Sequence, residues 1–258
     1  MAATWIRPPT RPAEIDTLVE GVDRYNPSNV QYLEDYLYQQ TRERQYDCLA
    51  NLAILKLYQF NQDLYNSDVV INILLKALTA APGPDFSLCL ALIGDRSVRA
   101  VTRPVSNMAT DYFSVHQPYQ TTDEPDPLLP LLPELTKLSE LLMTCRFPQF
   151  WSIYRSPELA PLRDNYTVEC VGFEDAVREV AIRAVRQTFR RIGTKRLGTY
   201  LDLEGSELEE YVHEQGWVLD GSNVVVPPNA DNVVRSTVQN EELKLPQLAK
   251  IIAHAQMA

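Results

Sequence analysis

The chain has 258 residues, of which 45% are hydrophobic and 22% are charged, and its net charge is -10 at pH 7. This is the composition of an ordinary globular protein with enough residues for one large domain or two smaller ones. The acidic charge repels nucleic acid overall, so we expect no DNA partner, although a local basic patch could still contact RNA.

Residues 1–11 lack the apolar core of a signal peptide, and we expect them to form a flexible N-terminus. No run in the sequence approaches the roughly 18 apolar residues that a membrane span needs. We therefore expect a cytoplasmic protein with no membrane partner.

Residues 12–92 are predicted to form successive amphipathic helices, because apolar residues recur there at the spacing of a helix face. Residues 49–57 and 69–78 are apolar almost all round, as in helices that are buried on more than one side. Stacked helix pairs of the HEAT-like or TPR-like type have this property, so we predict such a stack over residues 12–170. The expected first residues or caps of its early helices are Pro12, Asn26, Asp47, Ser67 and Asp85.

Prolines interrupt this pattern between residues 94 and 133. We predict a mobile, proline-rich insertion at about 103–127, because loops of this length in a compact domain are usually functional or disordered. Helices are expected to resume at Glu134 and to include Phe147–Arg155.

A long helix is predicted over Gly172–Ile192. Two shorter helices follow, Lys195–Leu203 and Ser206–Gln215, and Gly216 suits the end of the second because glycine accepts the left-handed conformation found there. Residues 229–258 are expected to be a linker and a last amphipathic helix, Glu241–Gln256, which could pack on its own domain or against a partner.

The turn pair Asp220-Gly221 lies between two strand-like runs, Trp217–Leu219 and Val224–Val226, and predicts a hairpin. Two helices followed by a hairpin resemble a winged helix, which we assign to residues 171–228. The overall prediction is a mostly α protein, a helical stack followed by a small α+β winged-helix domain.

The helix at Ser206–Gln215 has the wrong charge for reading nucleic acid, since it holds four glutamates and neither lysine nor arginine. We therefore interpret the winged helix as a protein-binding module. The apolar strand Val224–Val226 is the expected contact, because a strand with unpaired backbone groups invites pairing with another chain. The other interpretation, compatible with the first, is an inner partner strand of the hairpin that packs on Trp217 and Leu219. The predicted interface residues are Leu208, Tyr211, Trp217, Val224, Val225 and Val226.

Arginines cluster between Arg178 and Arg196. Arg183, Arg186 and Arg190 are predicted to share one helix face, with Arg191 beside them. An alternative function follows, in which this basic helix binds RNA phosphates directly. A solvated face, or pairing with acidic groups such as those of Ser206–Gln215, explains the same charges.

Residue patterns for catalysis are missing: the sequence has no GxSxG, P-loop or GxGxxG motif. His116, His213 and His254 have no metal-ligand spacing, and the four cysteines form no CxxC pair and are expected in the core. We expect no enzyme activity, no cofactor and no metal.

Several sequence blocks closely resemble the subunit k family of eukaryotic translation initiation factor 3. They occur in the family's order and cover most of residues 18–220, and the block Leu52–Asn61 is specific. The blocks are Gly21–Pro27, Ala50–Asn61, Ile73–Leu78, Asp85–Cys89, Cys145–Trp151, Gly172–Arg178 and Gly216-Trp217.

The resemblance implies a PCI-type architecture and a non-catalytic, scaffolding role in initiation of protein synthesis. It implies subunit l of the same factor as the direct partner, and an indirect or weak contact with the small ribosomal subunit. It also implies that winged helices of such proteins join edge to edge through the hairpin. A subunit of another PCI assembly, a proteasome lid or a signalosome, is the remaining alternative.

Overall fold

The computed structural model describes residues 7–94 and 126–233, together with positions 245, 248–249 and 252–253 near the C-terminus. In these residues the chain is mostly helical and has one small sheet. None of the described helices is long and apolar enough to cross a membrane.

The first half consists of helices joined by short 3₁₀ turns. In chain order they are α1 (Ala13–Glu20), η1 (Val22–Tyr25), η2 (Pro27–Asn29), α2 (Val30–Arg42), α3 (Cys48–Phe60), η3 (Gln62–Leu64), α4 (Ser67–Leu78) and α5 (Asp85–Ile93).

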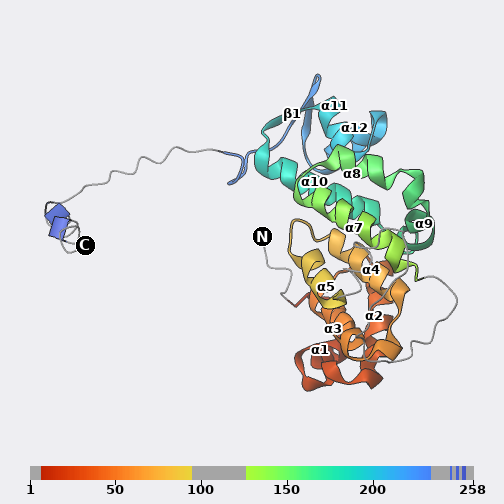
Figure 1. Ribbon diagram of the computed structural model, residues 1–258. Helices are drawn as coiled ribbons and strands as arrows, with labels where there is room; N and C mark the ends of the chain where they lie inside the picture. The colour runs from red at the N-terminus through yellow and green to blue at the C-terminus, as the bar shows by residue number, and fades with distance from the viewer. Residues whose placement is uncertain (1–6, 95–125, 234–244, 246–247, 250–251, 254–258) are drawn as a thin grey trace, which may run out of the picture.

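The second half begins with helices and ends with the sheet. Its elements are α7 (Leu128–Met143), α8 (Phe147–Tyr154), η4 (Pro157–Leu159), α9 (Ala160–Leu162), the π-helical η5 (Arg163–Thr167), α10 (Phe173–Thr188), β1 (Arg191–Gly193), α11 (Thr194–Leu201), α12 (Gly205–Glu214), β2 (Val218–Asp220) and β3 (Asn223–Val225). Figure 1 shows α1 to α5 at one end, β1, α11 and α12 at the other, and α7, α8 and α10 between them.

Helix α4 lies at the centre of the helical part. Every position from Val69 to Leu78 is buried, which confirms the prediction from its all-round apolar pattern. It contacts α2, α3 and α5 as well as α7 and α10. A cluster of buried apolar side chains then continues from Ile15 to Val226, so within the described residues the helices and the sheet share one core.

One charged side chain on α4 is buried with this core. Lys76 is 4% exposed, and its Nζ donates a hydrogen bond of 3.3 Å to the carbonyl oxygen of Gln40, in the last turn of α2. Burial lowers the pKa of Lys76. The backbone N–H of Gln45 donates to the same carbonyl at 3.1 Å, so two donors share an end group of the helix.

A buried ion pair ties the start of the chain to α3. The guanidinium of Arg11 donates to both carboxylate oxygens of Asp47, at 2.6 and 2.8 Å, and both side chains are 1% exposed. Asp47 also accepts from Tyr36 Oη and from the backbone N–H of Ala50, as the predicted cap of α3. The expectation of a flexible segment over residues 1–11 is therefore wrong at Arg11.

Two predicted helix starts are corrected. The side chain of Asn66, not that of Ser67, caps α4 by accepting from the N–H of Asp68. Helix α7 begins at Leu128, six residues before the predicted Glu134, and includes Pro133. The buried leucines of its first two turns, Leu128, Leu131 and Leu132, explain why the prolines do not end it.

The predicted long helix Gly172–Ile192 is also wrong at its end. Helix α10 ends at Thr188, and Arg191–Gly193 forms strand β1. The sheet is antiparallel with the order β1-β3-β2, in which Ile192 and Leu219 both lie opposite Val224. The turn between β2 and β3 holds Gly221 at φ +59, which suits glycine.

Two predicted segments lie largely outside the described residues. Of the insertion at 103–127 only positions 126 and 127 are described, and Pro127 there precedes α7. Five positions of the predicted last helix, Glu241–Gln256, are described, and all five are helical. They are Leu245, Leu248, Ala249, Ile252 and Ala253.

Replacing Arg11 with alanine is expected to destabilise the chain by about 3–5 kcal/mol, because it leaves the buried carboxylate of Asp47 without its cation. Urea unfolding of both proteins measures the difference. The matched control is Arg7→Ala, since Arg7 pairs with Asp16 from an exposed position and should cost under about 1 kcal/mol. Equal losses for the two variants would contradict the structural role of the buried pair.

Candidate protein-binding site

The exposed edge of the sheet is strand β2. It pairs on one side with β3, and its other side has no strand partner within the described part of the chain. Val218 is 62% exposed and Leu219 40% exposed. An edge strand with apolar side chains and free backbone groups can add a strand from another chain.

The strand that was predicted to make this contact is in the middle of the sheet. Strand β3 pairs with β1 and β2, so its backbone has no free edge, and the prediction of an exposed strand at Val224–Val226 is wrong. The order of strands in a sheet depends on residues that are distant in the sequence. The prediction rested on the hairpin sequence alone and therefore did not include β1. The correction moves the free edge from β3 to β2.

Four of the predicted interface side chains are buried inside the chain's own core. Leu208, Trp217, Val224 and Val226 are 4%, 5%, 0% and 1% exposed. They belong to the apolar core that the helices and the sheet share, and are not displayed to a partner. Tyr211 and Val225 are partly exposed, and their role in binding stays a prediction. Burial raises the pKa of Tyr211 to about 12, so this tyrosine is neutral at pH 7.

The sheet end of the molecule is fastened to the helices by side chains that cap α11. The last carbonyl groups of a helix lack intrahelical partners. Here Trp151 Nε1 of α8 donates to the carbonyl oxygen of Tyr200 at 2.9 Å, and Arg178 Nε of α10 donates to that of Leu201 at 3.0 Å. The positive charge of Arg178 also suits the negative end of the helix dipole.

Ion pairs surround this junction. Arg155, the residue after α8, lies 2.9 Å from Glu174 of α10 and 3.0 Å from Asp202, the residue after α11. Burial lowers the pKa of Arg155, but Glu174 and Asp202 outweigh burial and raise it. The Arg155 and Arg178 guanidinium groups lie 5.9 and 5.5 Å from the Trp151 ring centre, within cation–π distance. Three helices are thus fixed to one another around Trp151.

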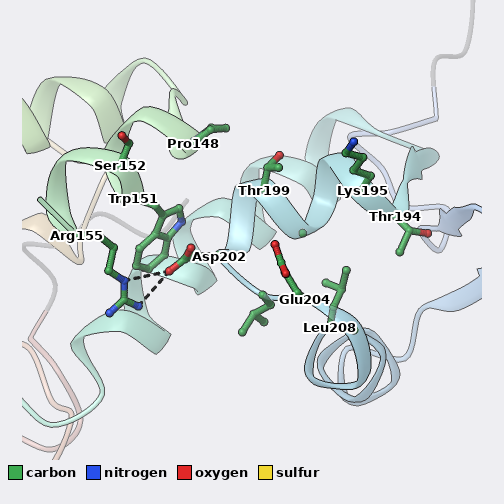
Figure 2. A pocket seen from close by; sticks show the side chains of 13 residues that line it. Pro148, Trp151, Ser152, Arg155, Thr194, Lys195, Thr199, Asp202, Glu204 and Leu208 are labelled. Carbon is green, nitrogen blue, oxygen red and sulfur yellow. Dashed lines mark hydrogen bonds and ion pairs between the residues drawn. The ribbon is translucent and has the colours of Figure 1, made fainter.

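A groove of about 800 Å³ opens beside the junction, between α8, α11 and α12. Figure 2 shows Pro148 and Ser152 on one side of it and Lys195, Thr199 and Leu208 on the other. Gly198 is a residue of α11 that faces the loop after this helix, and an added Cβ would come 2.8 Å from the carbonyl oxygen of Leu203. Glycine is therefore needed for this close packing.

The predicted RNA-binding arginines do not lie on one helix face. Arg183 and Arg186 are on α10, whereas Arg190 and Arg191 follow its end. Arg186 donates to the side chain of Gln215, and Arg191 forms an ion pair with Asp220. The side chains of Arg183 and Arg190 have no hydrogen bond or ion pair to any described residue.

Catalytic and metal-binding candidates are not brought together. Among the described residues no group of three or more His, Cys, Asp or Glu side chains could hold a metal ion. His213 is exposed on α12, and His116 and His254 lie outside the described residues. Cys48, Cys89 and Cys170 are buried as expected, but Cys145 is exposed at the end of α7, which corrects that prediction.

Comparisons with known proteins agree with one another. The model of the CSN8/PSMD8/EIF3K family matches residues 64–237. A protein of Mycosarcoma maydis named "Eukaryotic translation initiation factor 3 subunit K" is 43% identical over 99% of this chain and 95% of its own length. Proteins of the same name from Cryptococcus neoformans and Aspergillus fumigatus are 38% and 40% identical, over 97% and 94% of this chain and 94% and 93% of their own lengths.

Replacing Trp151 with phenylalanine is expected to cost about 1–3 kcal/mol, because a smaller aromatic ring replaces the indole and the Tyr200 carbonyl loses its donor. Urea unfolding measures the loss, and amide hydrogen exchange should speed up in α11. The control is Arg196→Ala, which changes an exposed side chain of α11. Its free energy of unfolding should stay within about 0.5 kcal/mol of the parent's. Unchanged exchange in α11 of Trp151→Phe would contradict the capping role.

Proposed function

This chain belongs to the CSN8/PSMD8/EIF3K family, and we propose that it works as a non-catalytic scaffold subunit of eukaryotic translation initiation factor 3. The observation that carries the proposal is its likeness, over nearly the whole chain, to proteins named as subunit K of that factor. The resemblance found in the sequence blocks is thereby confirmed. Its place of action is the cytoplasm, on the small ribosomal subunit, with the ribosome contacted indirectly or weakly.

We interpret the two parts of the fold as the two parts of a PCI-type protein. The helices of residues 12–170 are taken as a HEAT-like stack, and residues 171–228 as a winged helix made of α11, α12 and the sheet. Support comes from the central helix α4 with neighbours on several sides, and from the element order helix, helix, hairpin after β1. The predicted linker and last helix, residues 229–258, lie mostly outside the described residues.

The direct partner in this proposal is subunit l, and the contact is edge strand β2. An edge strand offers backbone hydrogen bonds that another winged helix can complete, and Val218 and Leu219 supply apolar area beside them. The acidic helix α12, with exposed Glu207, Glu209, Glu210 and Glu214, lies next to the hairpin and favours a partner with basic side chains there. The relatives' names speak against the proteasome-lid and signalosome alternatives.

The double variant Val218→Lys/Leu219→Lys tests this contact. Lysines on an edge strand oppose pairing with another strand, and we expect binding to subunit l to weaken at least about tenfold, or about 1.4 kcal/mol. Both side chains are exposed, so folding should be kept. Titration of labelled subunit l, followed by fluorescence anisotropy, measures the affinity.

A matched control places the same charge elsewhere. Val22 is 83% exposed on η1, in the part of the chain remote from the sheet, and Val22→Lys should bind like the parent. If parent chain and subunit l do not bind at moderate salt, the choice of partner is wrong. If they bind and the β2 variant binds equally well, the edge strand is not the contact.

A second candidate function is direct RNA binding, and one observation favours it. The side chains of Arg183 and Arg190 form no ion pair with the described residues, although the chain is acidic overall. Charges of this kind bind phosphates through release of counterions, which makes the affinity strongly dependent on salt.

Reversing Arg183, Arg186 and Arg190 to glutamate should abolish RNA binding in a gel shift if this candidate is correct. The parent's affinity should fall steeply between low and physiological salt. Reversal of Arg42, an exposed arginine on α2, is the control for net charge. A triple variant that shifts RNA as well as the parent removes the candidate.

A further inference from the structure

The C-terminal segment carries an apolar stripe that has no cover among the described residues. Leu245, Leu248 and Ile252 are helical, and they are 83%, 42% and 57% exposed. Their spacing of three and four residues puts them on one helix face. Such a face is stabilised by burial, at about 25 cal/mol for each Å² removed from water.

The groove between α8, α11 and α12 offers a matching surface. It is lined by the apolar side chains of Pro148, Trp151, Leu203 and Leu208. Its volume of about 800 Å³ lies within the range that ligand pockets of proteins occupy. The charges at its rim are only partly paired: Arg155 and Asp202 pair with each other, whereas Lys195 and Glu204 have no ion pair within the described part of the chain.

Chain length lets the segment reach this groove. Asn232 is held by hydrogen bonds from its Nδ2 to the carbonyl oxygens of Phe189 and Pro227, at 3.3 and 3.0 Å. From Phe189 the chain runs only five residues to Thr194 in the groove, a span of at most about 18 Å. The twelve Cα–Cα steps from Val233 to Leu245 can span about 40 Å when extended.

We propose that the stripe Leu245–Leu248–Ile252 docks in the α8–α11–α12 groove of its own chain. A tethered segment meets its own groove at an effective concentration in the millimolar range, which favours it over a second copy. The sequence beside the stripe also holds both signs of charge, Glu241 and Glu242 before it and Lys250 within it, to oppose Lys195 and Glu204. The proposal is independent of the initiation-factor assignment.

Cross-linking with a lysine-reactive reagent tests the docking in the full chain. Light and heavy isotope forms are mixed at low concentration, and links from Lys195 to Lys244 or Lys250 are measured by mass spectrometry. The comparison is Lys137, exposed on α7, whose links to the same two lysines report random encounters. We expect Lys195 links to exceed Lys137 links and to join residues of the same isotope.

Variants on both sides make the test specific. Leu245→Asp/Leu248→Asp in the stripe, and Pro148→Asp in the groove, should reduce the Lys195 links to the Lys137 level. Aspartate is tolerated in the first turn of α8, so Pro148→Asp should fold. The control Ala253→Asp adds the charge to the same segment outside the stripe and should keep the links. Equal Lys195 and Lys137 links in the parent, or links mainly between light and heavy chains, would overturn the proposal.

Discussion

The structure depends on the burial of α4 on all sides. A helix that is apolar all round must be surrounded, because any face left open would expose large aliphatic side chains to water. Helices from both halves of the chain, α2, α3 and α5 on one hand and α7 and α10 on the other, therefore pack against it. Lys76 of α4 is buried with these helices, and it donates to the carbonyl oxygen of Gln40 in the last turn of α2.

Helices α8 and α10 connect this helical centre to the part of the chain that holds the sheet. Both helices reach the C-terminal carbonyls of α11, one with the indole of Trp151 and the other with the guanidinium of Arg178. The hairpin is then held against α12 by Trp217 and Val224, while β2 stays at the open edge. A shared core that presents an edge strand suits a subunit that joins other subunits.

Local patterns in the sequence predicted the helices of the core and the family, but not the contacts between distant residues. Asp47 was recognisable as a cap, whereas its ion pair with Arg11 spans 36 residues and has no local signal. Strand β1 has three residues and follows an arginine-rich helix, so its sequence continued the helical pattern. The position of β3 between β1 and β2 depends on that missed strand, and the binding edge was misplaced for the same reason.

The central claim is that this protein serves initiation factor 3 by binding its other subunits. Its most direct test is to purify the chain, tagged and expressed at its natural level, and to identify the accompanying proteins by mass spectrometry. The account predicts subunits of initiation factor 3, with subunit l among the most abundant. Proteasome-lid or signalosome subunits in their place, or a chain that purifies without initiation-factor subunits, would contradict it.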